Sequence, residues 1–199
     1  MGLKISKEEL NQLPIETFNG DIIVIDKLDE VENAIEYLKQ FKTIGFDTET
    51  RPVFRKNVTH KVALMQLSTI DKCFLFRLNK IQYPDIIDEL ICNNEVVKVG
   101  LSLRDDFAAL RKRTDCPPLN FIDLQTFVVD YGIKDMSLQK IYAILFQKKI
   151  SKRQRLSNWE NNSLKESQKM YAAIDAWACL RIYNHLIKNG TNDITKEEK

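Results

Sequence analysis

Two carboxylates stand one residue apart at the end of an apolar run in the segment TIGFDTET, residues 43–50. If this run is a β-strand, Asp47 and Glu49 point to the same side of it, because side chains two residues apart share a face. Acids at a strand end are often solvated as the chain enters a loop, and that explanation suffices for an isolated pair. The alternative is a site for a hard cation such as Mg²⁺ or Mn²⁺, which needs further acids from elsewhere in the chain.

A second acidic pair, Asp105 and Asp106, lies where a predicted strand leads into a predicted helix over residues 102–113, with Ser102 as its predicted N-cap. Negative charge near a helix N-terminus is favourable in itself, which accounts for one of these aspartates or both. Asp106, however, falls beside the apolar stripe of the helix. That stripe consists of Leu103, Phe107 and Leu110. Asp106 is therefore the stronger candidate for a site.

A third acid, Asp175, lies inside the apolar part of a predicted helix over residues 163–189. Charged side chains are almost never fully buried without a partner, so either a metal or a buried arginine is needed to explain it. On this segment alone the metal is favoured. Tyr171 precedes Asp175 by four residues, so its hydroxyl projects from the same helix face.

Hydrophobic periodicity predicts the elements that must position these acids. The expected strands cover residues 21–26, 43–49, 61–69, 72–78, 95–100 and 120–124. The expected helices cover residues 29–41, 83–93, 102–113, 137–146 and 163–189. The third and fourth strands are separated by a short turn and read as a hairpin. Ser163 and Glu166 match a capping box at the start of the last helix, and Gly190 is suited to end it. Strands mixed with helices indicate an α/β domain with a mixed sheet.

Composition sets looser limits on function. The 199 residues suffice for one domain with a full core, and the 44% hydrophobic and 29% charged residues indicate a globular protein. A net charge of +2 does not by itself announce a nucleic-acid binder, so any basic patch must be local. No signal peptide or membrane span is evident. The four cysteines form no C-x-x-C pair, so a disulfide framework or zinc knuckles are not expected and a reducing environment is favoured. The expected location is therefore intracellular, and cytoplasmic if the protein is bacterial.

Taken together, the acidic segments resemble the motifs of the DEDD superfamily of 3′→5′ exonucleases, in the Tyr-containing branch that includes RNase D and the Werner-type exonuclease domain. The first motif is matched by FDTET, the second by VGLSLRDDFAAL and the third by YAAIDA. The segments VALMQLS, FIDL, SLQKI and SKRQRLSNW also resemble the family, although the proline that often follows the tryptophan is absent here. The resemblance implies a ribonuclease H-like fold, a mixed central sheet flanked by helices. It also divides the chain into an N-terminal extension (residues 1–20), an exonuclease domain (21–190) and a C-terminal tail (191–199).

The resemblance further implies a site for two divalent cations about 3.5–4 Å apart. In this expectation Asp47 bridges the two ions, Glu49 and Asp175 complete the ion nearest the attacking water, and Asp106 serves the second. Tyr171 orients the water by a hydrogen bond, since a phenol with a pKa of about 10 is a poor base. Ligation by oxygen alone favours Mg²⁺ or Mn²⁺ over zinc. The expected reaction is hydrolysis at the 3′ end of DNA or RNA, releasing nucleoside 5′-monophosphates.

Residues on the substrate side are weaker candidates. The segment 147–155 carries five basic residues just before the expected catalytic helix, and Lys152 best matches the family's lysine there. Charge runs are usually solvated, but a role on the phosphate backbone is plausible. Met65 and Gln66 lie on the strand opposite the first motif, where the apolar Met65 is more often a core residue and Gln66 fits either role. Trp159 could stack a base, although a tryptophan near a helix start more often serves packing. Two alternatives stay open: a non-catalytic nucleic-acid-binding module on the same fold, and a protein-interaction domain.

Overall fold

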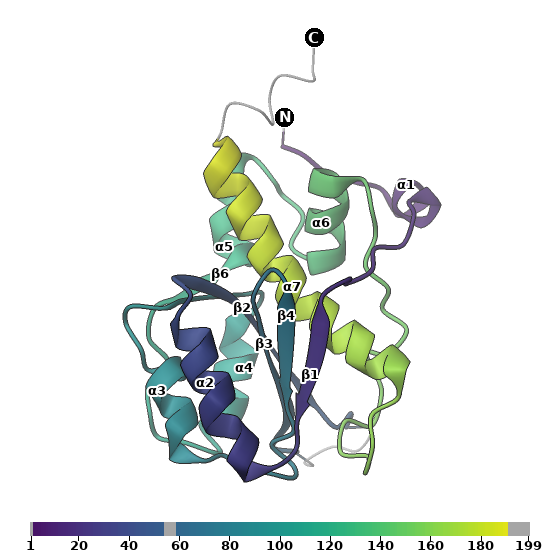
Figure 1. Ribbon diagram of the computed structural model, residues 1–199. Helices are drawn as coiled ribbons and strands as arrows, with labels where there is room; N and C mark the ends of the chain where they lie inside the picture. Colours follow the sequence, from purple (N-terminus) through teal and green to yellow (C-terminus); the bar gives the residue numbers. More distant parts are fainter. Residues whose placement is uncertain (1, 54–58, 191–199) are drawn as a thin grey trace.

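A computed structural model describes residues 2–53 and 59–190, and its centre is a six-stranded mixed sheet (Figure 1). The strand order is β1-β4-β3-β2-β5-β6. Strand β3 runs antiparallel to both of its neighbours, and the other pairs in the sheet are parallel. The strands are β1 (Asp21–Ile25), β2 (Thr43–Thr50), β3 (Val62–Ser68), β4 (Lys72–Phe76), β5 (Val97–Gly100) and β6 (Phe121–Asp123). The mixed sheet and the β3–β4 hairpin expected from the sequence are confirmed.

Helices cover both faces of this sheet, and each face has its own hydrophobic core. One core lies under α5 (Leu124–Phe127), α6 (Leu138–Phe146) and α7 (Glu166–Asn189). The other lies under α2 (Val31–Lys39), α3 (Asp88–Ile91) and α4 (Leu103–Leu110). Short 3₁₀ turns at Leu28–Glu30, Asp85–Ile87 and Val128–Tyr131 join these helices to their neighbours. Figure 1 shows α7 crossing the sheet on the side opposite α2 and α3.

The central strand β3 reads VALMQLS and is buried at every position. A strand covered by helices on both faces loses the alternation of apolar and polar residues. The polar residues of β3 are Gln66 and the terminal Ser68. Leu64 and Gln66 share the α7 face of the sheet, whereas Met65 and Leu67 belong to the core beneath α2 and α3.

The close approach of α7 to β2 depends on Gly45. A Cβ atom at this position would lie 2.0 Å from the carbonyl oxygen of Ala176, so a larger residue would push the helix away from the strand. Because Gly45, Asp47 and Glu49 alternate along β2, all three face α7. The contact between a glycine and a small helix residue thus brings the acidic end of β2 next to the helix that carries Asp175.

Two helix starts differ from the sequence prediction. Helix α7 begins at Glu166 with Lys165 as N-cap, whose backbone N–H donates to Gln168 Oε1 at 3.0 Å, so the predicted capping box of Ser163 and Glu166 is wrong. Ser102 is the N-cap residue of α4, but it has a left-handed φ of 62° and its side chain makes no capping hydrogen bond. The first turn of α4 is held instead by a carboxylate from β6, described below. Gly190 ends α7 as predicted, with a φ of 65°.

Residues before β1 pack on the domain as an arm that contains a short helix, α1 (Lys7–Gln12). Isolated parallel β-bridges join Leu3 to Ile133 and Ile15 to Lys149, so both ends of the arm are attached. Figure 1 shows the arm beside α6, on the side of the sheet where α7 lies. The sequence did not predict α1, α5 or the 3₁₀ turn that follows α5, which are too short for a clear hydrophobic period.

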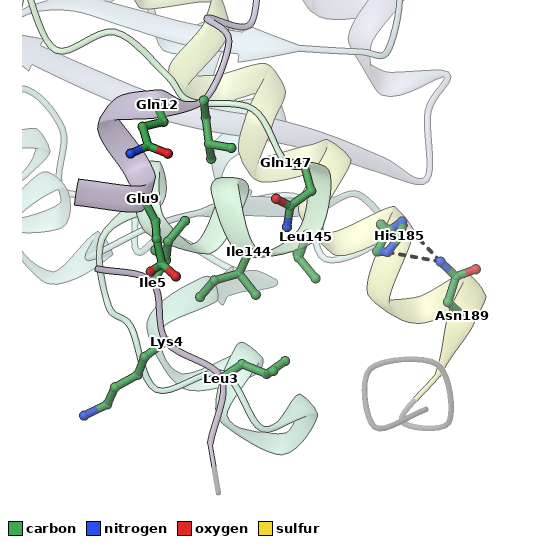
Figure 2. A pocket seen from close by; sticks show the side chains of 11 residues that line it. Leu3, Lys4, Ile5, Glu9, Gln12, Ile144, Leu145, Gln147, His185 and Asn189 are labelled. Carbon is green, nitrogen blue, oxygen red and sulfur yellow. Dashed lines mark hydrogen bonds between the residues drawn. The ribbon is translucent and has the colours of Figure 1, made fainter. Parts of the chain in front are cut away.

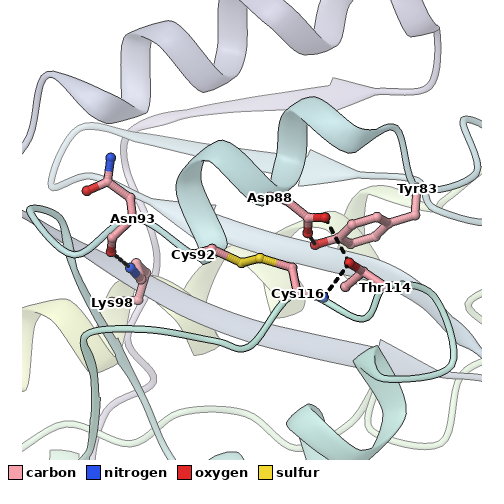
Figure 3. Close-up of a disulfide and its surroundings, with 7 residues drawn as sticks. All are labelled: Tyr83, Asp88, Cys92, Asn93, Lys98, Thr114 and Cys116. Carbon is pink, nitrogen blue, oxygen red and sulfur yellow. Dashed lines mark hydrogen bonds between the residues drawn. A yellow bond between two sulfur atoms is a disulfide. The ribbon is translucent and has the colours of Figure 1, made fainter.

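Cys92 and Cys116 form a disulfide between the end of α3 and the loop that follows α4 (Figure 3). The sequence favours a reducing environment over a disulfide framework and does not predict this pair. Their Cα atoms lie 6.4 Å apart although 24 residues separate them, a proximity that spacing alone does not reveal. Cys73 and Cys179 are free and buried. Over residues 2–53 and 59–190, no helix is long and apolar enough to cross a membrane.

Candidate active site

Three carboxylates from two elements meet on the α7 face of the sheet. Asp47 and Glu49 come from the end of β2, and Asp175 comes from the middle of α7. One oxygen of each lies within 4.8 Å of an oxygen of the other two, a spacing at which they could hold a metal ion. The family resemblance implied this convergence. In the structure it follows from the period of two along β2 and from the close packing of α7 on Gly45.

Asp106 lies beside this group of three. It comes from the first turns of α4 and accepts a hydrogen bond from the hydroxyl of Thr48, the residue between the two acids of β2. Its charge reaches the cluster, since it raises the pKa of both Asp47 and Glu49. Asp105, the preceding residue, is exposed. Of the two aspartates in this helix, the structure therefore brings Asp106 to the site.

Burial dominates the electrostatics of the cluster. It raises the pKa of Asp47 well above its ordinary value, and the charges of Asp175, Asp106 and Glu49 raise it further. Burial and the charges of Asp175 and Asp106 raise the pKa of Glu49 to about 9. The pKa of Asp175 rises to about 7 and that of Asp106 to about 6, again chiefly through burial. Without a cation the cluster thus retains protons at neutral pH, and a bound cation would displace them.

Tyr171 lies one turn before Asp175 on α7, as the sequence predicted, and is largely buried. Burial raises its pKa far above the ordinary value, and the charges of Asp175 and Glu49 add to the effect. The phenol therefore stays protonated throughout the physiological range and can act as a hydrogen-bond donor but not as a base. Its hydroxyl lowers the pKa of Asp175, because it favours the charged carboxylate.

Trp159 is fully buried and packs against Tyr171, with ring centroids 6.0 Å apart. Its indole ring is therefore a packing residue next to Tyr171 and is not exposed for stacking on a base. The indole N–H lowers the pKa of Glu49, although it makes no hydrogen bond of good geometry with any acceptor in the described part of the chain. Arg155 also lowers the pKa of Glu49 through its charge.

The two β3 candidates separate onto opposite faces. Met65 has no exposed surface and packs in the core beneath α2 and α3, away from the carboxylates, so the structure does not bring it to the site. Gln66 pairs directly with Asp47 across the β2–β3 ladder and is fully buried on the carboxylate side. Neither its amide nitrogen nor its amide oxygen has a hydrogen-bond partner among residues 2–53 and 59–190. An unsatisfied buried amide beside a carboxylate is available to a ligand or an ordered water.

A cavity of about 320 Å³ opens beside the cluster. Asp47, Tyr171 and Asp175 line one side of it. The other sides are lined by residues that include Ser102, Gln125, Gln139, Ile150 and Lys152. Of the predicted substrate-side residues, Lys152 is the one that reaches this cavity, and its charge lowers the pKa of Asp175. The cavity is wide enough for part of a ligand and places polar amides opposite the carboxylates.

One carboxylate that fixes the site was not singled out from the sequence. Asp123, at the end of β6, accepts hydrogen bonds from the backbone N–H groups of Ser102 and Leu103, both at 2.9 Å. It also accepts one from the N–H of Gln125 at 2.9 Å, so a single side chain holds the N-termini of α4 and α5. Asp123 therefore sets the position of the helix that carries Asp106. The signal in the sequence was an acid directly after an apolar strand, which is too common to be informative.

A family described as 3′-5′ exonuclease matches residues 22–190 of this chain. This span contains all four carboxylates of the cluster and nearly the whole of both cores. The chain belongs to the 3′-5′ exonuclease family. Its membership supports a nuclease function and confirms the expected DEDD superfamily, whose members act at 3′ ends of nucleic acids.

Sequence and structure comparisons agree with this assignment. The chain is 30% identical over 187 residues to the mouse bifunctional 3′-5′ exonuclease/ATP-dependent helicase WRN, in a match that covers 88% of this chain and 13% of that protein. The chain thus spans a small part of that relative's length. The fold matches the Aedes aegypti Nibbler EXO domain with a TM-score of 0.76 and 22% identity, covering 87% of this chain and 91% of that one.

A Trypanosoma brucei RNase D, crystallised with RNA U12, has the same fold. The TM-score is 0.76 at 19% identity, and the match covers 89% of this chain and 65% of that one. At such low identity the similarity establishes the fold alone. The ribonuclease H-like architecture expected from the sequence is confirmed by these neighbours and by the strand order.

Proposed function

We propose that this protein is a metal-dependent 3′→5′ exonuclease. It hydrolyses the terminal phosphodiester bond at the free 3′ end of DNA or RNA and releases nucleoside 5′-monophosphates. The observation that carries the proposal is the convergence of the half-buried Asp47, Glu49 and Asp175, of which one oxygen each lies within 4.8 Å of the others. Three carboxylates at this distance repel each other. The charges of Arg155 and Lys152 offset part of this repulsion, but among the described residues neither forms a salt bridge with the three acids, so a cation is the partner that explains them.

The donor set fits two divalent cations, Mg²⁺ or Mn²⁺. Every candidate ligand in the cluster is a carboxylate oxygen. Hard cations such as Mg²⁺ and Mn²⁺ prefer oxygen ligands, whereas zinc sites usually include histidine or cysteine. Asp47 lies centrally and is assigned to both ions, Glu49 and Asp175 to the first, and Asp106 to the second. Asp106 is set apart by its hydrogen bond to Thr48, which suits a ligand that acts at the outer ion or through water. Gln66, paired with Asp47 across the β2–β3 ladder, has an unsatisfied amide that would be available to a water molecule or to a ligand.

When bound, the cations supply a lowered pKa for the attacking water and stabilise the negative charge that develops on the phosphate and the leaving 3′ oxygen. The protein's own contribution is position. Tyr171 keeps its proton and orients the water by a hydrogen bond, as its raised pKa requires. Trp159, packed behind Tyr171, keeps that ring in place. Lys152, on the far side of the cavity, attracts the phosphate backbone.

We assign this activity to residues 21–190, with residues 1–20 as an N-terminal extension and 191–199 as a tail. The tail and residues 54–58 lie outside the described residues. We keep an intracellular location as part of the proposal, since the substrate is a nucleic acid.

Digestion of a nucleic acid labelled at its 5′ end tests the proposal. With Mg²⁺ or Mn²⁺ the protein should shorten single-stranded DNA or RNA from the 3′ end, giving a ladder of products and free nucleoside 5′-monophosphates. EDTA should abolish the reaction. Asp47→Ala should remove activity while the circular dichroism spectrum stays unchanged. If the protein binds the strand in the presence of metal but never shortens it, the non-catalytic binding module replaces the enzyme.

A further inference from the structure

The N-terminal arm is joined by its backbone to the basic segment 147–155. Ile15 and Lys149 form a parallel bridge, in which the N–H of Lys149 donates to the carbonyl of Pro14 and the N–H of Glu16 donates to the carbonyl of Lys149, both at 2.9 Å. The ammonium group of Lys149 also donates to the carbonyl of Asn11. The arm and the start of the basic segment therefore behave as a short two-stranded unit.

Glu16 anchors this unit to the rest of the domain. Its side chain is only 5% exposed and accepts four hydrogen bonds, one from the neighbouring backbone N–H of Thr17 and three from other parts of the chain. The hydroxyl of Tyr142 in α6 donates at 2.7 Å, Arg181 Nη1 in α7 at 2.9 Å and Lys148 Nζ in the basic segment at 3.0 Å. Burial opposes ionisation of Glu16, but the hydrogen bonds from Tyr142, Lys148 and the Thr17 N–H hold the pKa of Glu16 below its ordinary value. The carboxylate is thus a charged junction between the arm, two helices and the basic segment.

The junction lies close in sequence to the catalytic cavity. Ile150 follows the bridged Lys149, and its carbonyl accepts a hydrogen bond from the side-chain amide of Gln139 at 2.6 Å. Ile150, Gln139 and Lys152 all line the cavity beside the carboxylates. Two of the five basic residues in the segment, Lys148 and Lys149, are committed to the arm, which leaves Lys152, Arg153 and Arg155 to face a phosphate backbone.

A cavity of about 640 Å³ lies between the rest of the arm and helices α6 and α7, and Figure 2 shows Glu9 and Gln12 of the arm on one side with Ile144 and His185 on the other. The two backbone bridges of the arm lie at its ends, at Leu3 and at Ile15 next to the Glu16 junction. Loss of the junction would release the end that lies next to the basic segment.

We propose that Glu16 is a positioning residue for substrate binding: it fixes the basic segment, and Lys152 in particular, against the entrance of the catalytic cavity. The inference rests on the proposed nuclease function, and it makes the N-terminal arm part of the nucleic-acid site. Because Glu16 is proposed to act on the binding of the nucleic-acid strand and not on the carboxylates, its loss should raise KM and leave kcat nearly unchanged.

The test compares Glu16→Gln with Glu8→Gln, which removes the same charge from the exposed side of α1. Binding is measured by fluorescence anisotropy with a 5′-fluorescein-labelled oligodeoxythymidine in EDTA, and turnover is measured with Mg²⁺. In Glu16→Gln we expect Kd and KM to rise about tenfold, as for loss of one charge-assisted hydrogen bond, with kcat within about twofold. The dependence of log Kd on log salt should become shallower by about one phosphate contact. Glu8→Gln should match the wild type.

Tyr142→Phe provides a second, milder variant in case Glu16→Gln does not fold. It removes one neutral donor from the junction and should raise Kd by about threefold, again with kcat retained. Unchanged Kd, KM and salt dependence in both variants would overturn the inference, and so would a fall in kcat at constant KM. A wild-type protein that binds the strand without shortening it would overturn the proposed function instead, while the binding comparison would still decide the role of Glu16.

Discussion

Replacement of Asp175 by Asn should stabilise the metal-free protein while it abolishes activity. In the folded protein the pKa of Asp175 is raised from 3.8 to about 7, chiefly by burial. A carboxyl whose pKa is higher in the folded state than in the unfolded state makes folding less favourable as the pH rises. The cost begins near the unfolded pKa of 3.8, grows up to about 7 and stays constant above that value. The side-chain amide in Asp175→Asn carries no charge at any of these pH values and avoids this cost.

The expected size follows from the same two values. A tenfold change in proton affinity corresponds to about 1.4 kcal/mol, so the penalty at pH 8 reaches at most about 4 kcal/mol. At pH 5 the penalty is only about 1–2 kcal/mol, because this pH lies only about one unit above the unfolded pKa of 3.8. The substitution should also lower the pKa of Glu49 and Asp47, since the charge of Asp175 contributes to both. The gain in the free energy of unfolding is therefore larger at pH 8 than at pH 5.

Urea denaturation in EDTA at these two pH values measures the effect. The control is Asp105→Asn, which removes one exposed acid from α4 and should change stability by less than about 0.5 kcal/mol. Addition of Mg²⁺ or Mn²⁺ should stabilise the wild type and not the Asp175 variant, because the cation binds the folded protein through that carboxylate. Equal or lower stability of Asp175→Asn at pH 8 would show that Asp175 is not held at a repulsive, unpaired site.

The remaining predictions concern single groups around the cluster. Tyr171→Phe should lower kcat by about tenfold or more and change KM little, since only the orienting hydroxyl is lost, and steady-state kinetics with an oligonucleotide measure both. Asp106→Asn should reduce Mg²⁺-dependent activity severely and Asp105→Asn only mildly; the reverse order in the same assay would transfer the site role to Asp105. Gly45→Ala should destabilise the fold by about 2 kcal/mol or more in thermal unfolding, because its Cβ would meet the Ala176 carbonyl at 2.0 Å, and an unchanged Tm would refute the tight β2–α7 contact.

Much of the site could be predicted because it depends on short-range periodicity. Asp47 and Glu49 share a strand face, and Tyr171 and Asp175 share a helix face, and these relations hold in any fold that keeps the strand and the helix. Asp106 was favoured over Asp105 by the apolar stripe of its helix, and the structure places it beside the cluster. Such relations can be predicted from the sequence because the geometry of a single strand or helix determines them.

The rest required long-range contacts that no spacing encodes. The face of β3 could be assigned only from its neighbours, and this is why Met65 was placed on the substrate side when it belongs to the opposite core. The role of Asp123 depends on three backbone N–H groups. Those of Ser102 and Leu103 are about 20 residues away in sequence, and that of Gln125 is two residues away. The Glu16 junction joins residues up to 165 positions apart. The same holds for the disulfide of Cys92 and Cys116.

Divalent cations at a nucleic-acid site are proposed to hold the half-buried carboxylates together. A crystal structure with Mn²⁺ and a nucleoside 5′-monophosphate tests this claim most directly, by anomalous scattering at the manganese edge. We expect two anomalous peaks about 3.5–4 Å apart, with Asp47 between them and the phosphate in contact with both. Asp47, Glu49 and Asp175 turned toward each other with no anomalous signal at millimolar Mn²⁺ would contradict the claim.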